Sequence, residues 1–148
     1  MAGINYWEIE QAIVERLKGD DTLVGVAVLS EADLAFNREP TIIVYLERRD
    51  ATPEQSLSAH TRLRQRLRFS IVCYEFSLEI NEAQRRRDDL IHRTEIALMN
   101  GPTAFGRSDI NFSFLEGGEF DTSKDSQEGR FVSAGEVILI ADCTAVVE

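Results

Sequence analysis

Residues 62–79 constrain the fold more than any other part of the chain, because they form the longest candidate strand in the sequence. The first half alternates arginines with leucine, glutamine and phenylalanine, and residues 70–76 are apolar enough to lie in a core. At about 3.3 Å per residue, one strand over this segment is longer than a small domain is wide. We therefore expect the strand either to bend at a bulge or to project beyond the body, and its arginines favour projection.

Two amphipathic segments predict helices. In residues 5–18, Asn5 and Glu8 stand at the spacing of a capping box, and apolar residues recur every three or four positions. The second helix is expected from Asn81 or Glu82 to Met99, with Asn81 as its cap and Asn100-Gly101-Pro102 as its stop. Its expected buried stripe consists of Ala83, Leu90, Ile91, Thr94, Ala97 and Leu98.

The remaining strands are expected at residues 23–29, 41–46, 110–115 and 130–147, with a short extended segment at Glu119-Phe120. The last strand is apolar on both faces at residues 137–141 and should be central in the sheet. Residues 50–60 and 121–129 are polar and aperiodic, so we expect loops that are mobile in the free chain and ordered by partners. The order of elements predicts an α+β fold, with a mainly antiparallel sheet, two helices packed on one face, and long strands projecting from the body.

The composition is that of one globular domain spanning residues 1–148. Hydrophobic residues make up 43% of the 148 and charged residues 28%. A chain of this length buries enough surface for a core without disulfides or a structural metal. Cys73 and Cys143 lie in apolar stretches with no metal or redox spacing, so we expect buried free thiols in a reducing compartment.

No motif points to catalysis, a metal or a cofactor. His60 and His92 are not at a ligand spacing, and the acidic pairs Asp20-Asp21 and Asp88-Asp89 are more typical of a loop and a solvated helix face. Gly117-Gly118 lacks the lysine and the following helix of a phosphate-binding loop. No nucleophile signature occurs. We expect no enzyme activity and no catalytic, cofactor-binding or metal site.

The arginine row, Arg62, Arg64, Arg66 and Arg68, is the most unusual feature of the sequence. On a strand these four side chains share one face. The chain has 16 basic and 26 acidic residues and a formal net charge of −10, which argues against general nucleic-acid coating but not against a surface that DNA slides past. The row is either a solvated face, a contact to an acidic partner such as another copy, or a contact to DNA phosphate, and the acidic partner is favoured.

Three acids near the double glycine, Glu116, Glu119 and Asp121, are candidate complements to the arginine row of a neighbouring subunit. Residues 85–87, three consecutive arginines on the second helix, could extend the row. Because a desolvated ion pair matters more than an exposed one, we expect the row to affect assembly strongly and folding little.

Several stretches in chain order resemble one protein family. They are Glu-Arg-Leu-Lys in the first helix, Pro-Thr-Ile-Ile-Val-Tyr, the basic strand running into Phe-Ser-Ile-Val-Cys-Tyr, Ala-Leu-Met-Asn-Gly-Pro, and Phe-Leu-Glu-Gly-Gly-Glu-Phe before the last strand. With this order the chain resembles the tail terminator (tail completion) proteins of long-tailed bacteriophages. The resemblance covers nearly the whole chain and lies in pattern and order rather than in an invariant motif.

This resemblance implies a non-enzymatic virion protein at the tail–neck junction, assembled in the host cytoplasm. Such proteins form a ring, usually of six subunits, that caps the tail tube, stops its growth and presents a surface to the head connector. The implied partners are other copies, the tail tube protein and the head connector, with DNA passing through the lumen without specific binding. Two alternatives stay open: a head-completion or neck protein of the same particle, and a small intracellular α+β enzyme or ligand-binding domain.

The sequence also bears on export and membranes. Its first residues lack the basic and apolar regions of a signal peptide. The longest apolar runs, residues 24–29 and 137–141, are far shorter than the roughly 20 residues that cross a bilayer. We therefore expect a soluble protein with neither a signal peptide nor a membrane partner.

Overall fold

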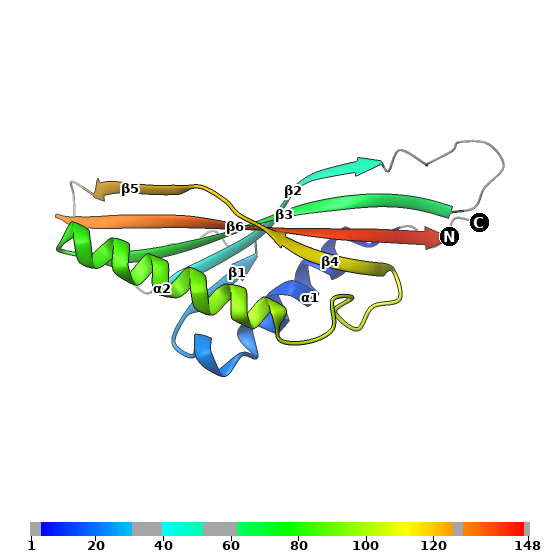
Figure 1. Ribbon diagram of the computed structural model, residues 1–148, viewed down its shortest axis with the longest axis horizontal. Coiled ribbons are helices and arrows are strands. Elements are labelled where there is room, and N and C mark those ends of the chain that lie inside the picture. The colour runs from blue at the N-terminus through cyan, green and yellow to red at the C-terminus, as the bar shows by residue number, and fades with distance from the viewer. Residues whose placement is uncertain (1–3, 31–39, 52–61, 126–128, 147–148) are drawn as a thin grey trace.

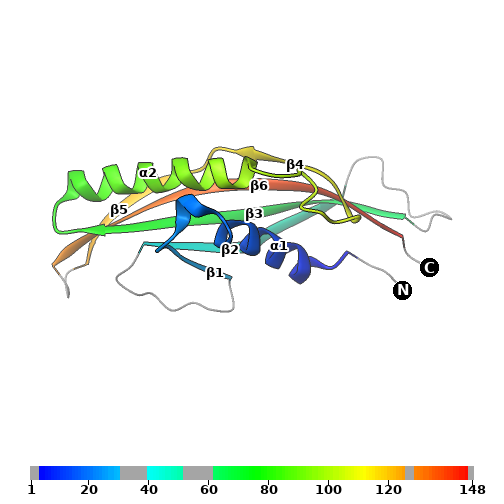
Figure 2. The same ribbon diagram turned by 90° about the horizontal axis from the view of Figure 1, so that it is seen from below.

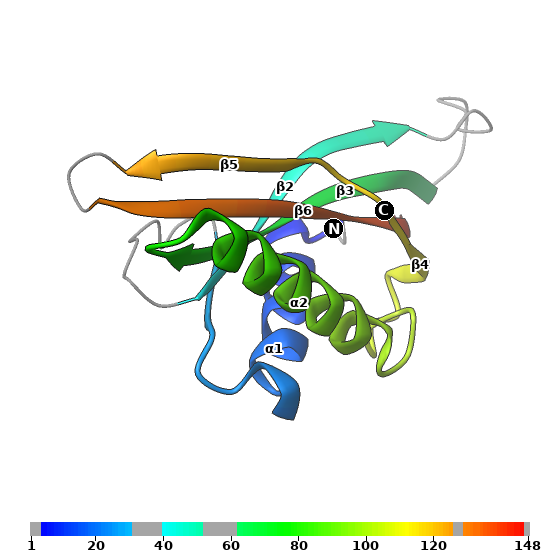
Figure 3. The same cartoon turned by 60° about the vertical axis from the view of Figure 1, so that its left-hand side comes forward.

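The computed structural model describes residues 4–30, 40–51, 62–125 and 129–146. In chain order they form α1 (Tyr6–Lys18), the short 3-10 helix η1 (Asp21–Leu23), β1 (Ala27–Ser30), β2 (Thr41–Ala51), β3 (Arg62–Ser77), α2 (Ile80–Met99), β4 (Ile110–Glu116), β5 (Phe120–Asp125) and β6 (Arg130–Val146). The strands make one six-stranded sheet, and both helices lie against the same face of it (Figure 1, Figure 3).

The two longest strands, β3 and β6, pair antiparallel from Arg62 opposite Val146 to Ser77 opposite Phe131. Figure 2 shows them running the length of the molecule. The strand order is β1-β2-β3-β6-β4, and β5 pairs with β6 beyond the end of β4. The pair β1 and β2 is parallel, and the other pairings among the described strands are antiparallel. This architecture confirms the predicted α+β class and the central position of the last strand.

The core lies between the sheet and the helices. Alternation along a strand sends every second side chain to the helix side, and there Leu67, Phe69 and Ile71 of β3 are fully buried beside Leu139 of β6. α1 packs on β1 and β2, and α2 packs on β3 and β6. The predicted stripe of α2 is buried throughout. α1 contributes Ile9, Ile13, Val14 and Leu17.

The arginine-rich half of β3 is not a free arm. It pairs with β2 as far as Gln65 opposite Ala51, and with β6 along its other edge. On the helix side, the Tyr6 hydroxyl of α1 donates to Gln65 Oε1 at 2.7 Å. The expected projection is therefore wrong for residues 64–68, because two neighbouring strands and α1 hold this half in the sheet.

Residues 121–125 also differ from the expectation. They were expected to lie in a mobile loop, but they belong to β5 and pair with β6. This polar segment forms a strand because β6 continues beside it and supplies backbone partners, which the pattern of the segment itself does not reveal. The other expected loop falls partly in β2, which extends to Ala51, while residues 52–61 lie outside the described residues.

Helix and strand boundaries differ in two further places. α2 begins at Ile80 with Glu79 as its cap residue and no side-chain capping bond, so the expected cap at Asn81 is wrong. The expected strand over residues 23–29 begins only at Ala27, because the residues before it form η1 and a turn. The predicted cap of α1 is confirmed, since Asn5 Oδ1 accepts from the backbone N–H of Glu8 at 3.0 Å.

Gly135 of β6 is a point of close approach between α2 and the sheet. A Cβ placed there would lie 2.0 Å from Ile91 Cδ1 and 3.1 Å from Cδ1 of the Phe120 ring. A glycine within a strand is typical of such close approach. Gly135 therefore makes room for the Ile91 side chain of α2 and for the Phe120 ring of β5.

We predict that Gly135→Val lowers the free energy of unfolding by about 1–3 kcal/mol, because Ile91 and Phe120 must move to admit the new side chain. The matched control is Gly117→Ala, at a position where a Cβ meets no atom within 4 Å. Its stability should stay within about 0.5 kcal/mol of the wild type. Urea unfolding followed by circular dichroism measures both, and a wild-type midpoint for Gly135→Val would contradict the close approach.

Both cysteines are buried free thiols, as predicted. Cys73 lies opposite Gly135 on β6, whereas Cys143 lies opposite Gln65 of β3. Eight residues along β3 separate these two levels, about 26 Å at strand spacing, far beyond the reach of a disulfide. Burial raises the pKa of each thiol to about 12.

We predict that neither cysteine reacts with a thiol reagent at pH 8 while the chain is folded. The reacting species is the thiolate, which burial suppresses at both positions. Both should be labelled once the chain is unfolded in guanidinium, and intact-mass measurement counts the labels. Rapid labelling of either cysteine in the folded chain would contradict the prediction.

Candidate subunit interface

The described arginines of the row face away from the helices. Leu67 and Phe69 point into the core, so the alternating Arg64, Arg66 and Arg68 point to the opposite, open face of the sheet. Arg62 begins β3 opposite Val146, but its side chain lies outside the described part of the structure. The predicted division of β3 into an apolar and a basic face is confirmed for residues 64–69.

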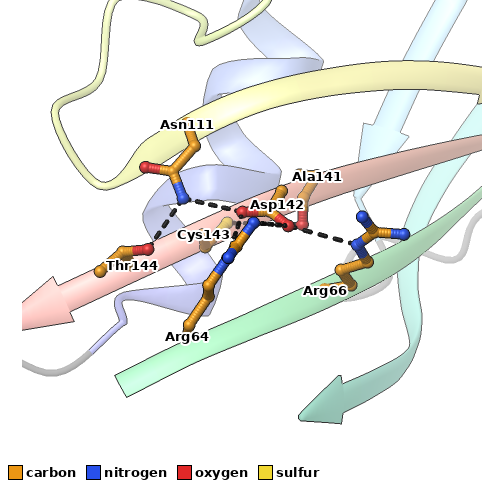
Figure 4. A network of polar contacts seen from close by, with 7 residues as sticks. All are labelled: Arg64, Arg66, Asn111, Ala141, Asp142, Cys143 and Thr144. Carbon is orange, nitrogen blue, oxygen red and sulfur yellow. Dashed lines mark hydrogen bonds and ion pairs between the residues drawn. The ribbon is translucent and has the colours of Figure 1, made fainter. Parts of the chain in front are cut away.

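A buried carboxylate lies between two of these arginines. The side chain of Asp142 on β6 is 0% exposed, and its oxygens accept from Arg64 Nε at 3.1 Å and Arg66 Nε at 3.2 Å (Figure 4). The amide of Asn111 also donates to Asp142, at 2.7 Å, and to the Thr144 hydroxyl at 2.8 Å. The β4–β6 register shifts between Ile110 and Phe112, so Asn111 sits at an irregularity in the pairing.

The electrostatics of Asp142 are set by opposing effects. Burial by itself raises the pKa of this carboxyl, but hydrogen bonds from Asn111, Arg64 and Arg66 outweigh it, and the pKa lies below its usual value. The carboxylate is therefore ionised at neutral pH and neutralises part of the arginine row from within the chain.

Arg68 is also bound within the chain. Its Nε donates to Glu47 of β2 at 3.0 Å, and its Nη1 donates to Glu116 of β4 at 3.1 Å. The pair with Glu116 crosses β6, where Ile138 and Ile140 are almost completely buried. Glu116, expected to complement a neighbour's arginine, is thus a partner of Arg68 in the same subunit.

Aromatic rings from β4 lie beside the arginine row. Phe112 and Phe114 are each 38% exposed and stack with ring centroids 6.3 Å apart. Arg66 lies over the Phe114 ring at 6.0 Å. Arg48 of β2, opposite Arg68, adds an exposed guanidinium that pairs with Asp50. We call the surface formed by Arg48, Arg64, Arg66, Phe112 and Phe114 the arginine–aromatic patch.

The other candidate residues lie where the chain passes from β4 to β5 (Figure 1). We call this corner, residues 116–121, the notch. Glu136 of β6 pairs with Val72 of β3 on one side, but on the side of β4 and β5 no residue lies opposite it in the pairing, and its N–H donates to the Glu119 carbonyl at 2.9 Å. Gly118 permits this passage, because a Cβ there would lie 2.1 Å from the Glu136 carbonyl oxygen. Two hollows of about 280 and 170 Å³ flank Phe120, which lines both.

The arginines of α2 do not extend the row, because α2 lies on the opposite face of the sheet. Arg85 and Arg86 bind Glu82 on the helix itself. Arg87 points to the sheet, donates to the Ser133 hydroxyl at 3.0 Å, and lies over the Phe120 ring at 4.3 Å. Its spacing of four from Ala83, which lies in the buried stripe, is the one sequence signal for the burial of Arg87.

The structure brings together residues that sequence reasoning left unconnected. The sequence pattern assigns no role to Asn111 or to Asp142. The aromatic rings beside the row also went unpredicted, because Phe112 and Phe114 come from a strand far away in sequence. Glu119 and Asp121 do lie at the notch, but on β5 and its approach rather than in a loop.

The described residues also bear on two further features, a metal site and a membrane-spanning helix. Among them, no group of three His, Cys, Asp or Glu side chains is placed to hold a metal ion. No helix in the described ranges is long and apolar enough to cross a membrane.

No protein-family model matches the chain, and no curated protein matches it in sequence. In three dimensions the chain is similar to a chain in the structure titled "Virion of native gene transfer agent (GTA) particle". The TM-score is 0.57 at 10% sequence identity, and the alignment covers 97% of this chain and 100% of that one. The two chains therefore share a fold over nearly their full lengths.

We predict that Asp142→Asn lowers the free energy of unfolding by about 1–3 kcal/mol at pH 7, because Arg64 and Arg66 lose their buried carboxylate partner. A carboxyl with a lowered folded-state pKa stabilises the fold above its unfolded pKa of about 4, and this contribution is lost as the pH falls further. The wild type and the variant should therefore converge in stability below about pH 4. Urea unfolding between pH 3 and pH 7 measures the difference, and a constant gap would contradict the assignment.

Proposed function

We propose that this chain is a structural subunit of a phage-like particle, and that it forms a closed ring, of six copies, that terminates the tail tube. The ring would stop growth of the tube and join it to the head connector, with DNA passing through the lumen without specific binding. The protein would act in the virion at the tail–neck junction, after assembly in the host cytoplasm, and would have no enzymatic activity.

One observation carries this proposal: the fold match with the gene transfer agent virion extends over 97% of this chain and the whole of the other. The resemblance of the sequence to tail terminators supports the same kind of particle independently, since it rests on the order of sequence elements.

The surfaces of the chain support assembly into a ring. A closed ring with one kind of subunit requires two different contact surfaces on each copy. The arginine–aromatic patch and the acidic notch are two such surfaces, and aromatic and arginine side chains are enriched in protein interfaces. Arg62, Arg64, Arg66, Glu119 and Asp121 are therefore proposed interface residues, while Arg68 and Glu116 support the patch from within the subunit.

We predict that the purified chain, alone or after addition of the tail tube protein of its particle, forms closed rings of six copies. Native mass spectrometry measures the copy number, and negative-stain microscopy shows whether rings are closed and where they sit on the tubes. A chain that stays monomeric in both conditions, or that grows into long helical polymers, would contradict the proposal. Rings found at the head portal rather than on tube ends would identify a neck protein instead.

A further inference from the structure

The notch carries carboxylates that have no partner within the described part of the chain. Glu95 of α2 lines the larger hollow, and Glu119 and Asp121 line the smaller one. Their side chains make no hydrogen bond or ion pair with another described residue. Glu116 and Glu136, by contrast, are occupied, by Arg68 and by the Ser70 hydroxyl. The notch therefore presents negative charge that the described residues of the subunit do not neutralise.

Apolar side chains lie beside the carboxylates in both hollows. Phe120 is 61% exposed, although Arg87 and Gly135 hold its ring in place on the helix side. Ile91, Leu115 and Val137 line the larger hollow beside it.

Because side chains alternate along a strand, Asp121 and Val72 face the open side of the sheet, opposite to the Phe120 ring. The smaller hollow therefore joins Glu119 and Asp121 to the apolar Val72 and Ala134. This combination matches an arginine, whose aliphatic stem packs on apolar surface while its N–H groups bind carboxylates.

The arginine–aromatic patch offers this chemistry. Arg66 donates to Asp142 through Nε alone, and its terminal nitrogens make no hydrogen bond to another described residue. The side chain of Arg66 is 49% exposed and that of Arg48 is 63% exposed. Phe112 and Phe114 place exposed aromatic surface next to them. Asp142 holds the Arg66 side chain in position, so little side-chain freedom is left to lose on binding.

We propose that the notch of one copy binds the arginine–aromatic patch of a second copy of this chain, with Arg66 beside Glu119 and Asp121 in the smaller hollow. This inference rests on the proposed function and names the contact within it. Along β6, Asp142 at the patch and Ala134 beside Asp121 are about 26 Å apart, so the two surfaces are distinct. Contact between two different surfaces is head-to-tail, and each added copy leaves a free patch or notch for the next.

Two variants with altered charge test this contact. The notch variant, Glu119→Arg with Asp121→Arg, changes exposed residues that have no partner within the described chain. The patch variant, Arg48→Glu with Arg66→Gln, leaves Arg64 and Asn111 bound to Asp142. Each variant alone should raise the concentration at which half of the chains are assembled by about tenfold or more. The notch variant places arginines against the arginines of the patch, and the patch variant removes the positive charges that the notch carboxylates would bind.

The matched control is Glu15→Arg with Asp21→Arg. These exposed acids on α1 and η1 give the same change in net charge as the notch variant but lie away from both surfaces. The control should assemble like the wild type. Thermal unfolding verifies that each variant folds, and Gly117→Arg replaces the notch variant if that variant does not fold, since a Cβ at Gly117 meets no atom within 4 Å. Arg48→Glu alone likewise replaces the patch variant.

Mixing the two variants gives the most specific result. In the mixture, the altered patch of the patch variant can bind the altered notch of the notch variant, because their charges are opposite. The wild-type notch of the patch variant can bind the wild-type patch of the notch variant. An equimolar mixture should therefore recover closed assemblies in which the two chains alternate in equal number. Native mass spectrometry with one chain isotopically labelled measures this composition.

Each alternative result has a distinct meaning. If the wild type assembles and either variant assembles equally well, or if the mixture fails to recover, the patch–notch contact is overturned while the ring remains. If the mixture recovers only dimers, the contact is mutual between two copies and the head-to-tail arrangement is overturned. If the wild type never assembles, with or without the tube protein, both the contact and the proposed function are overturned.

Discussion

The pairing of β3 with β6 is the interaction on which the rest of the structure depends. It places Arg66 opposite Asp142 on the open face and Leu67 opposite Ala141 on the helix side. Because side chains alternate between faces, a shift of one residue would turn Leu67 and Phe69 outward and the arginines into the core. One register therefore determines both the core under the helices and the charged surface above it.

The same register explains how an acidic chain tolerates a row of arginines. Like charges along one strand repel each other, and the neighbouring strands supply the opposite charge. β6 places Asp142 between Arg64 and Arg66, while β2 and β4 place Glu47 and Glu116 on the two sides of Arg68. The row is therefore paired within the subunit as well as exposed on its surface, and its predicted effects on folding and assembly stay predictions.

The notch forms because β4 and β5 both pair with β6. Because β6 is longer than either β4 or β5, both pair with it in succession, and the crossing between them leaves the hollows around Phe120. Gly118 and Gly135 are the residues without side chains that permit this crossing and the approach of α2. In the proposed ring, a stable subunit and its contact surfaces thus depend on the same central strand.

The sequence by itself determined the two helices, the buried stripe of α2, the α+β class, the burial of both cysteines and the basic face of β3, because periodicity within one element is a local property. Only the tertiary structure decided that residues 120–125 form a strand, that Asn111 and Asp142 bind the arginine row, and that Phe112 and Phe114 lie beside it. Each of these depends on which strand lies next to which, and that is set by pairing between segments far apart in the chain.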